Sequence, residues 1–185
     1  MATLTAGAST LVRVFRLDQD AWRNLAATGT FGGAALITIG AYAILAFDRL
    51  GIQGMVDPRA TVRLLMVGFY GWLWLAVSAW AIGRVVLGAD AALATVLRLY
   101  GNAHLPLVFV GIGIQVFSVV ARTQSPALVI AVLAGLVWMP AMLVAATRVV
   151  FDLEPGKAAL VVAGPYLVWL LTVGRYLLGQ LGHLL

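Results

Sequence analysis

The side chains of this sequence that could do chemistry are two histidines, seven carboxylates and twelve basic residues, and there is no cysteine. His104 begins a long apolar run. A histidine there could be the axial ligand of a haem or chlorophyll-type macrocycle, or could hydrogen-bond water or backbone at a membrane interface. Two isolated histidines, His104 and His183, without cysteine make a poor metal site. Neither a metal nor a cofactor is therefore predicted.

The carboxylates all lie outside the long apolar runs. No two of them share an inward helical face, which is where a proton or ion relay through a bundle usually places them. The chain also has no G-x-G-x-x-G, P-loop or G-x-S-x-G motif in a suitable context. Since a nucleophile, a base and a metal set are missing as well, the sequence predicts a protein that is not an enzyme.

The basic residues are eleven arginines and one lysine, and they stand singly between apolar runs. There is no basic cluster with interleaved exposed aromatics, so nucleic acid is not an expected partner. Single arginines at the ends of apolar runs are typical of membrane topology signals. Four basic residues are expected on one side of a membrane, in contact with lipid headgroups: Arg84, Arg98, Arg148 and Lys157.

The composition indicates which solvent surrounds these residues. Hydrophobic residues make up 63% of the chain and charged residues 10%, against about 45–50% and about 25% in soluble domains. A membrane helix needs about 20 apolar residues, and five runs approach or exceed that length. The sequence predicts an all-α integral membrane protein with five spans, at roughly 25–47, 62–86, His104 or Pro106 to 120, 126–149 and 158–178.

Two amphipathic segments accompany these spans. In 9–23, apolar residues recur near helical spacing with charges off that face, which predicts an N-terminal interfacial helix. In 91–100, four apolar residues share one face, which predicts a short interfacial helix between spans two and three, with Asp90 as its N-cap. The chain divides accordingly into an N-terminal amphipathic segment, 1–24, and a five-helix transmembrane domain, 25–185.

The distribution of basic residues predicts the orientation. With a cytoplasmic N-terminus, seven basic residues lie on the cytoplasmic side and five on the other, which the positive-inside rule favours. Five spans then place the C-terminus outside, and the inner or plasma membrane is the expected location. Arg175 would cost about 2.5–3.5 kcal/mol at the bilayer centre, so we place it near the far interface.

Several residues within the spans predict contacts between helices. Gly29 and Gly33 form a G-x-x-x-G pair in span one, which permits close approach of another helix. Gln115, a strongly polar side chain in span three, is expected to hydrogen-bond a neighbouring helix. Pro140 and Pro165 are interior to spans four and five, which predicts kinks whose freed carbonyls are satisfied by neighbours.

Two segments carry a family likeness. In the first, Gly83-Arg84 ends an apolar helix, a surface segment follows, and Gly101 leads to Pro106 at the start of the next span. In the second, Arg148 precedes a turn, and Gly-Lys-Ala-Ala from Gly156 begins the last span. These motifs resemble the bacterial branch of the Yip-domain family of five-span membrane proteins.

The resemblance covers roughly residues 25–180 and implies this fold and a cytoplasmic N-terminus. Eukaryotic members of the family interact with Rab GTPases and act in vesicle traffic and membrane shaping. This chain lacks their acidic Asp-Leu-Tyr-Gly-type motif and has a short N-terminal tail. A Rab-type GTPase is therefore not an expected partner.

These features together favour a non-catalytic membrane protein that binds lipids and partner membrane proteins, as a scaffold or accessory subunit of a larger assembly. One alternative is a small-molecule transporter or channel, if Pro140 and Pro165 break their helices around a site near mid-membrane. A second is a pigment- or haem-associated subunit, with His104 as the macrocycle ligand.

Overall fold

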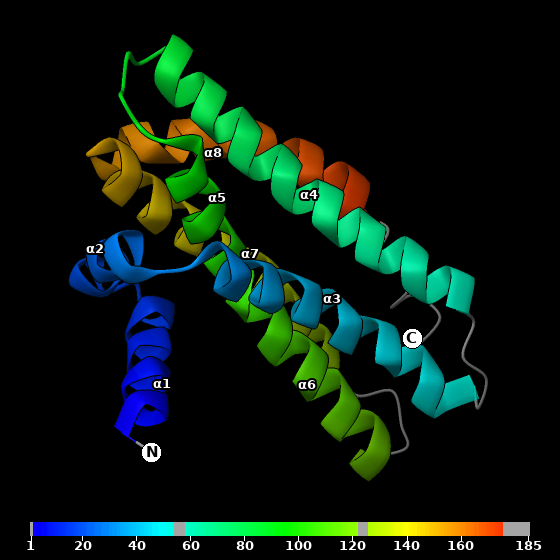
Figure 1. Cartoon of the computed structure of the whole chain (residues 1–185). Coiled ribbons are helices and arrows are strands. Elements are labelled where there is room, and N and C mark those ends of the chain that lie inside the picture. The colour runs from blue at the N-terminus through cyan, green and yellow to red at the C-terminus, as the bar shows by residue number, and fades with distance from the viewer. Residues whose placement is uncertain (1, 54–57, 122–125, 176–185) are drawn as a thin grey trace.

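The computed structural model of the chain describes residues 2–53, 58–121 and 126–175, and all regular structure in these residues is helical (Figure 1). The predicted all-α fold is confirmed. The elements are α1 (Ala2–Phe15), α2 (Gln19–Thr28), α3 (Phe31–Gln53), α4 (Pro58–Val85), α5 (Leu93–Asn102), α6 (Leu105–Ala121), α7 (Pro126–Phe151), α8 (Pro155–Trp169) and η1 (Leu170–Gly174), a π-helical turn that continues α8.

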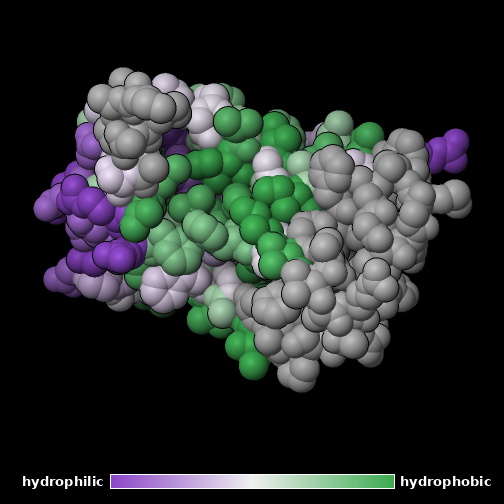
Figure 2. Space-filling view, turned by 90° about the horizontal axis from the view of Figure 1, so that it is seen from below, coloured by the Kyte–Doolittle hydropathy of each residue, from purple (hydrophilic) through white to green (hydrophobic). Residues whose placement is uncertain are grey.

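The long helices form a bundle built for hydrocarbon. Four stretches are long and apolar enough to cross a membrane, and a fifth is obtained if α2 and α3 count as one bent span. The helices pack in a closed series, α4 on α3, α3 on α6, α6 on α7, α7 on α8, and α8 back on α4. Large apolar side chains cover the outer faces, and Figure 2 shows them next to a hydrophilic end. Such a surface requires lipid as solvent, so this is a multi-pass membrane protein.

The N-terminal segment forms two helices, and the single helix predicted over 9–23 is wrong. The chain leaves α1 because Leu17 adopts a left-handed conformation (φ 62°). Asp18 then caps α2 by accepting two backbone N–H bonds of 3.0 and 3.3 Å. Arg13 Nε donates to the same carboxylate at 2.8 Å. The Asp18 cap divides the segment into two helices, although the periodic pattern of apolar residues continues through the cap.

The Arg13 hydrogen bond gives Asp18 a testable titration. That bond, followed by the backbone N–H of Ala21, lowers the pKa of the Asp18 carboxyl. Because the folded-state pKa is below the unfolded one, ionised Asp18 stabilises this turn above the unfolded pKa, and the contribution is lost as the pH falls through the lowered value. We expect an NMR titration midpoint below the ordinary value of about 3.9, and a higher midpoint in Arg13→Gln.

The matched control for this titration is Arg23→Gln, which removes the neighbouring Arg23–Asp20 ion pair of 3.1 Å. It should leave the Asp18 midpoint nearly unchanged. Equal midpoints in wild type and Arg13→Gln would show that the ion pair does not hold the cap in solution.

A bend of 116° separates α2 from α3, so the first long apolar helix begins at Phe31 and not near residue 25. Gly29 lies at the bend in an extended conformation, and a Cβ there would lie 2.4 Å from the carbonyl oxygen of Leu25. Gly33 lies in the first turn of α3, where a Cβ would meet only the hydroxyl of Thr30. The predicted G-x-x-x-G face is therefore not formed, because the bend divides the pair.

Close helix contacts occur at other glycines. A Cβ on Gly68 of α4 would lie 2.2 Å from the ring of Tyr42 in α3. A Cβ on Gly101 of α5 would lie 2.7 Å from the Cβ of Ala34, also in α3. The spacing of α3 from both neighbours thus depends on these missing side chains.

The segment predicted as a surface helix, α5, is packed inside the bundle against α3, α4 and α7. Most of its C-terminal half is buried, including Leu99 and Tyr100. After a short break α6 continues, and Leu93–Gly113 together is one of the four stretches long enough to span. Its N-cap is Ala92 and not Asp90.

Indole groups of α4 hold α5 in this position. The Nε1–H of Trp72 donates to the carbonyl of Leu97, and that of Trp80 donates to the carbonyl of Ala91, both at 2.9 Å. Gln115 lies further along, in α6, and its side chain falls outside the part of the chain that the structure describes, as does His183.

Pro140 and Pro165 lie inside α7 and α8, and both helices continue through them. Pro140 has no N–H for the carbonyl of Leu136, one turn earlier, and the hydroxyl of Tyr166 in α8 donates to that carbonyl instead. The carbonyl of Pro165 accepts a 3.1 Å bond from Trp74 Nε1. The broken helices on which the transporter alternative depends are thus not formed at these prolines.

Candidate functional site

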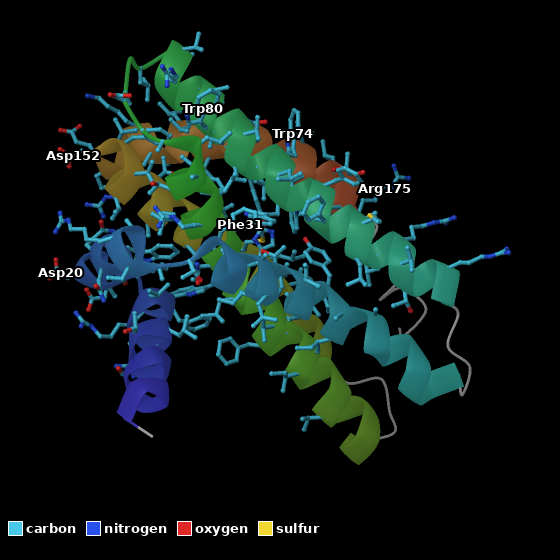
Figure 3. All side chains as sticks on the ribbon, viewed as in Figure 1. Asp20, Phe31, Trp74, Trp80, Asp152 and Arg175 are labelled. Carbon is cyan, nitrogen blue, oxygen red and sulfur yellow. The ribbon has the colours of Figure 1, made fainter. Side chains whose placement is uncertain are left out.

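Charged side chains gather where α2, the start of α5, the ends of α4 and α7, and the beginning of α8 meet. We call this region the charged end. Figure 3 shows Asp20, Trp80 and Asp152 at this end and Arg175 at the other. Its basic residues are Arg13, Arg16, Arg23, Arg84, Arg98, Arg148 and Lys157. Its acidic residues are Asp18, Asp20, Asp90, Asp152 and Glu154. All four predicted headgroup-binding residues therefore lie at one end of the bundle.

The carboxylates at the charged end do not neutralise these four residues. The ion pairs between described residues there are Arg13–Asp18 at 2.8 Å and Arg23–Asp20 at 3.1 Å, both within the N-terminal helices. Arg84, Arg98, Arg148 and Lys157 form no ion pair with any described residue. The positive charge of these four residues is thus not neutralised by a carboxylate of the described part of the chain.

Arg84 and Lys157 are exposed at the rim of the charged end. Arg84 lies in the last turn of α4, with its guanidinium 5.7 Å from the centre of the Trp80 ring, a cation–π arrangement. Lys157 lies in the first turn of α8, where the positive end of the helix dipole adds to its charge. Both positions favour an anion that approaches from outside.

Arg98 has a role that the sequence did not predict. It is half-buried, and its Nη1 donates to the carbonyl of Gly29 at 2.8 Å while Nη2 donates to the hydroxyl of Thr95 at 3.0 Å. The first bond joins α5 to the bend between α2 and α3. Arg98 therefore holds the fold at this bend, and two of its donors are used within the protein.

Arg148 lies in the last turn of α7 and is half-buried. Its Nε is covered by protein and has no hydrogen-bond partner, and its guanidinium makes no hydrogen bond to any described side chain. A covered cationic donor without an acceptor is unusual. The Nε of Arg98 also lacks a partner, but its Nη groups are bonded, whereas no guanidinium nitrogen of Arg148 is bonded to a described residue.

His104 lies inside the bundle and not at an interface, because α5 and α6 enter it together. The ring is wholly buried, with Nδ1 2.9 Å from the carbonyl oxygen of Tyr100 and the ring of Tyr42 6.0 Å away. Its Nε2 is buried and has no partner. Because protein atoms enclose Nε2, no room exists beside it for a macrocycle, and the pigment or haem alternative does not fit.

No sequence pattern predicts the other polar groups that are buried without a partner. The indole N–H of Trp22 in α2 is wholly buried without an acceptor, although the sequence pattern places Trp22 among the apolar residues of an amphipathic face.

In the described part of the chain, no group of three or more histidine, aspartate or glutamate side chains is placed to hold a metal ion.

Comparison with known proteins points in the same direction as the fold. The family model of the Yip1 domain matches residues 3–175, a range that begins in α1 and ends just after η1. No curated protein and no solved structure matches the chain.

Proposed function

The chain belongs to the Yip1 domain family, and from this membership we propose that it is a non-catalytic membrane protein that binds anionic lipids at its charged end and partner membrane proteins along its sides. It acts as a scaffold or accessory subunit of a larger membrane assembly. The observation that carries this proposal is a set of basic residues at one end of the bundle without carboxylate partners. Anionic headgroups are the partners that a membrane offers to such residues.

The outer face of α4 supports the second part of the proposal. Phe69, Tyr70 and Trp74 are exposed there, at 36%, 64% and 46%. Aromatic side chains are enriched in protein interfaces because they bury large areas at low entropic cost. This face of α4 is where we expect a partner membrane protein to pack.

The charged end is proposed to face the cytoplasm, with the N-terminal helices on that side and the C-terminus outside. The support is the excess of basic residues at the charged end, since the positive-inside rule favours such an end on the cytoplasmic side of the inner or plasma membrane. Arg175 is exposed and lies at the opposite end (Figure 3).

The test is purification from native membranes in mild detergent, with analysis of the retained lipids and proteins. We expect anionic phospholipids to be enriched over their share in the membrane and at least one partner chain to remain bound. Replacing Arg84, Arg148 and Lys157 together by glutamine should weaken the binding of anionic lipid by about a hundredfold, because about 1 kcal/mol is lost for each of the three basic residues.

The matched control is the double variant Arg59→Gln with Arg63→Gln, two exposed basic residues at the opposite end of α4. It should keep the lipid profile of the wild type. A wild-type protein that carries neither enriched anionic lipid nor a partner chain would overturn the proposal.

A further inference from the structure

Arg148 lies on the face of α7 that is turned toward lipid. It follows Ile130 by 18 residues and Val137 by 11, which are close to five and three full helical turns. These two residues are 66% and 70% exposed. The unpartnered guanidinium of Arg148 thus stands at the charged end of an apolar stripe on the outside of the bundle.

Lys157 has the corresponding position on α8. It begins a stripe that continues through Leu160 and Val168, which are 77% and 44% exposed. Since α8 packs against α7, and only Asp152–Glu154 separate the two helices in the chain, the two stripes belong to neighbouring helices. Both begin with a basic residue at the charged end.

The first turn of α8 adds donors of its own. Its N-cap residue, Glu154, makes no side-chain hydrogen bond to the free N–H groups of this turn, and such groups favour an anion. Asp152 and Glu154 are exposed and form no ion pair with Arg148 or Lys157. The side-chain donors of Arg148 and Lys157 at the head of the two stripes therefore have no acceptor among the described residues.

We propose that the outer surface between α7 and α8 binds a single anionic phospholipid. Its phosphate accepts hydrogen bonds from Arg148 and Lys157, and its acyl chains lie on the stripes through Val137 and Leu160. The Nε of Arg148 is covered by protein, but its two Nη groups are not among the covered atoms and have no partner in the described residues, so they can donate to a phosphate through two parallel bonds. This inference rests on the proposed function for the chemical class of the ligand. It adds the position of the binding site, the two residues that bind the phosphate, and a stoichiometry of one lipid per chain.

The buried polar atoms elsewhere do not offer such a site. Tyr42, His104 and Trp169 carry unpartnered polar atoms, but all three side chains are wholly buried and so cannot be reached from outside. Trp22 is wholly buried as well, and Arg98, whose Nε also lacks a partner, has both Nη groups bonded to Gly29 and Thr95. Arg148 differs from these groups because none of its guanidinium nitrogens is bonded to a described residue.

The experiment is native mass spectrometry of the whole chain in detergent, titrated with short-chain phosphatidic acid, phosphatidylglycerol or phosphatidylcholine. We expect one molecule of an anionic lipid to bind tightly, and phosphatidylcholine to bind at least about tenfold more weakly. Arg148→Gln should weaken the anionic lipid about tenfold. Arg148→Lys should recover part of this loss, because it keeps the charge and loses the two-bond geometry.

Two further variants separate the headgroup from the acyl chains. Leu160→Gln should weaken lipid binding severalfold, while Leu36→Gln, which changes an equally exposed residue (73%) on α3, should not. Inorganic phosphate alone should bind at least about tenfold more weakly than the lipid, because it gains nothing from the apolar stripes. Equal affinity for inorganic phosphate would identify a soluble anion as the ligand and overturn the lipid site.

Lipid binding that is unchanged in Arg148→Gln, or that falls equally in Arg84→Gln, would also overturn this site. Neither result would affect the proposed function, because lipid could still collect around the whole charged end. Conversely, a single lipid that depends on Arg148 in a protein without partner chains would leave this site intact and contradict the scaffold role.

Discussion

Replacing Gly101 by alanine is expected to lower the free energy of unfolding by about 1–3 kcal/mol, and replacing it by leucine should cost more. The added Cβ would lie 2.7 Å from the Cβ of Ala34 and 2.9 and 3.0 Å from its carbonyl oxygen and carbon. Backbone atoms cannot rotate out of the way, so α3 and α5 would have to move apart. Thermal unfolding in mild detergent, followed by circular dichroism, measures the loss.

A separation of α3 from α5 would also disturb polar groups. The hydroxyl of Thr38 in α3 donates to the carbonyl of Ala34 at 3.0 Å and approaches the carbonyl of Gly101 at 3.4 Å. This buried hydroxyl joins the two helices at the same contact. The substitution at Gly101 should therefore have a cost at the upper end of the range for one added methyl group.

The matched control is Gly113→Ala in α6, where nothing lies within 4 Å of the added Cβ. Alanine is favoured over glycine inside a helix by about 0.5–1 kcal/mol, so this variant should be as stable as the wild type or slightly more stable. Equal effects of the two substitutions would show that α3 and α5 are not in close contact in solution.

The apolar runs predict the bundle well because their length is set by one physical quantity, the thickness of the hydrocarbon layer. That quantity does not determine where a helix begins. The bend at Gly29 and the cap at Asp18 arise from local backbone conformation and from hydrogen bonds to Arg98 and Arg13. These partners lie on other elements or in the preceding turn, so hydropathy contains no signal for them.

The burial of α5 shows the limit of amphipathic patterns. Arg98 and Asn102 share a polar face that is typical of an interfacial helix. In the structure Arg98 bonds Gly29 and Thr95, and Asn102 Nδ2 donates to the carbonyl of Arg98 at 2.8 Å. A polar face that is satisfied by protein in this way can be buried. The sequence alone cannot distinguish such a face from one that is satisfied by water.

For the predicted headgroup-binding residues, too, the sequence predicts the position in the bundle but not the neighbours of each side chain. The order of the apolar runs predicts that Arg84, Arg98, Arg148 and Lys157 share one end of the bundle, and each lies near a helix end or in the short helix between two long ones. Which of them is free to bind a ligand depends on neighbours from distant parts of the chain. Arg98 is used within the fold, whereas Arg148 has no partner among the described residues.

Removing the hydroxyl of Tyr166 should destabilise the bundle by about 1–3 kcal/mol, because the carbonyl of Leu136 would lose its donor. This carbonyl depends on Tyr166 since Pro140, one turn later, has no N–H to offer. Tyr166→Phe keeps the ring and its stacking on Trp169, where the centroids are 5.4 Å apart. Unfolding in mild detergent, compared with wild type, measures the effect.

The cause can be isolated in a double-mutant cycle with Pro140→Ala, which restores a backbone N–H within reach of the Leu136 carbonyl. In that background Tyr166→Phe should cost less, with a coupling energy of about 0.6–1.7 kcal/mol, the range measured for hydrogen bonds between membrane helices. Tyr70→Phe, which changes an exposed tyrosine on the outer face of α4, should have little effect in either background. If Tyr166→Phe costs the same with and without Pro140, the hydroxyl does not replace the missing N–H, and the continuity of α7 through its proline needs another explanation.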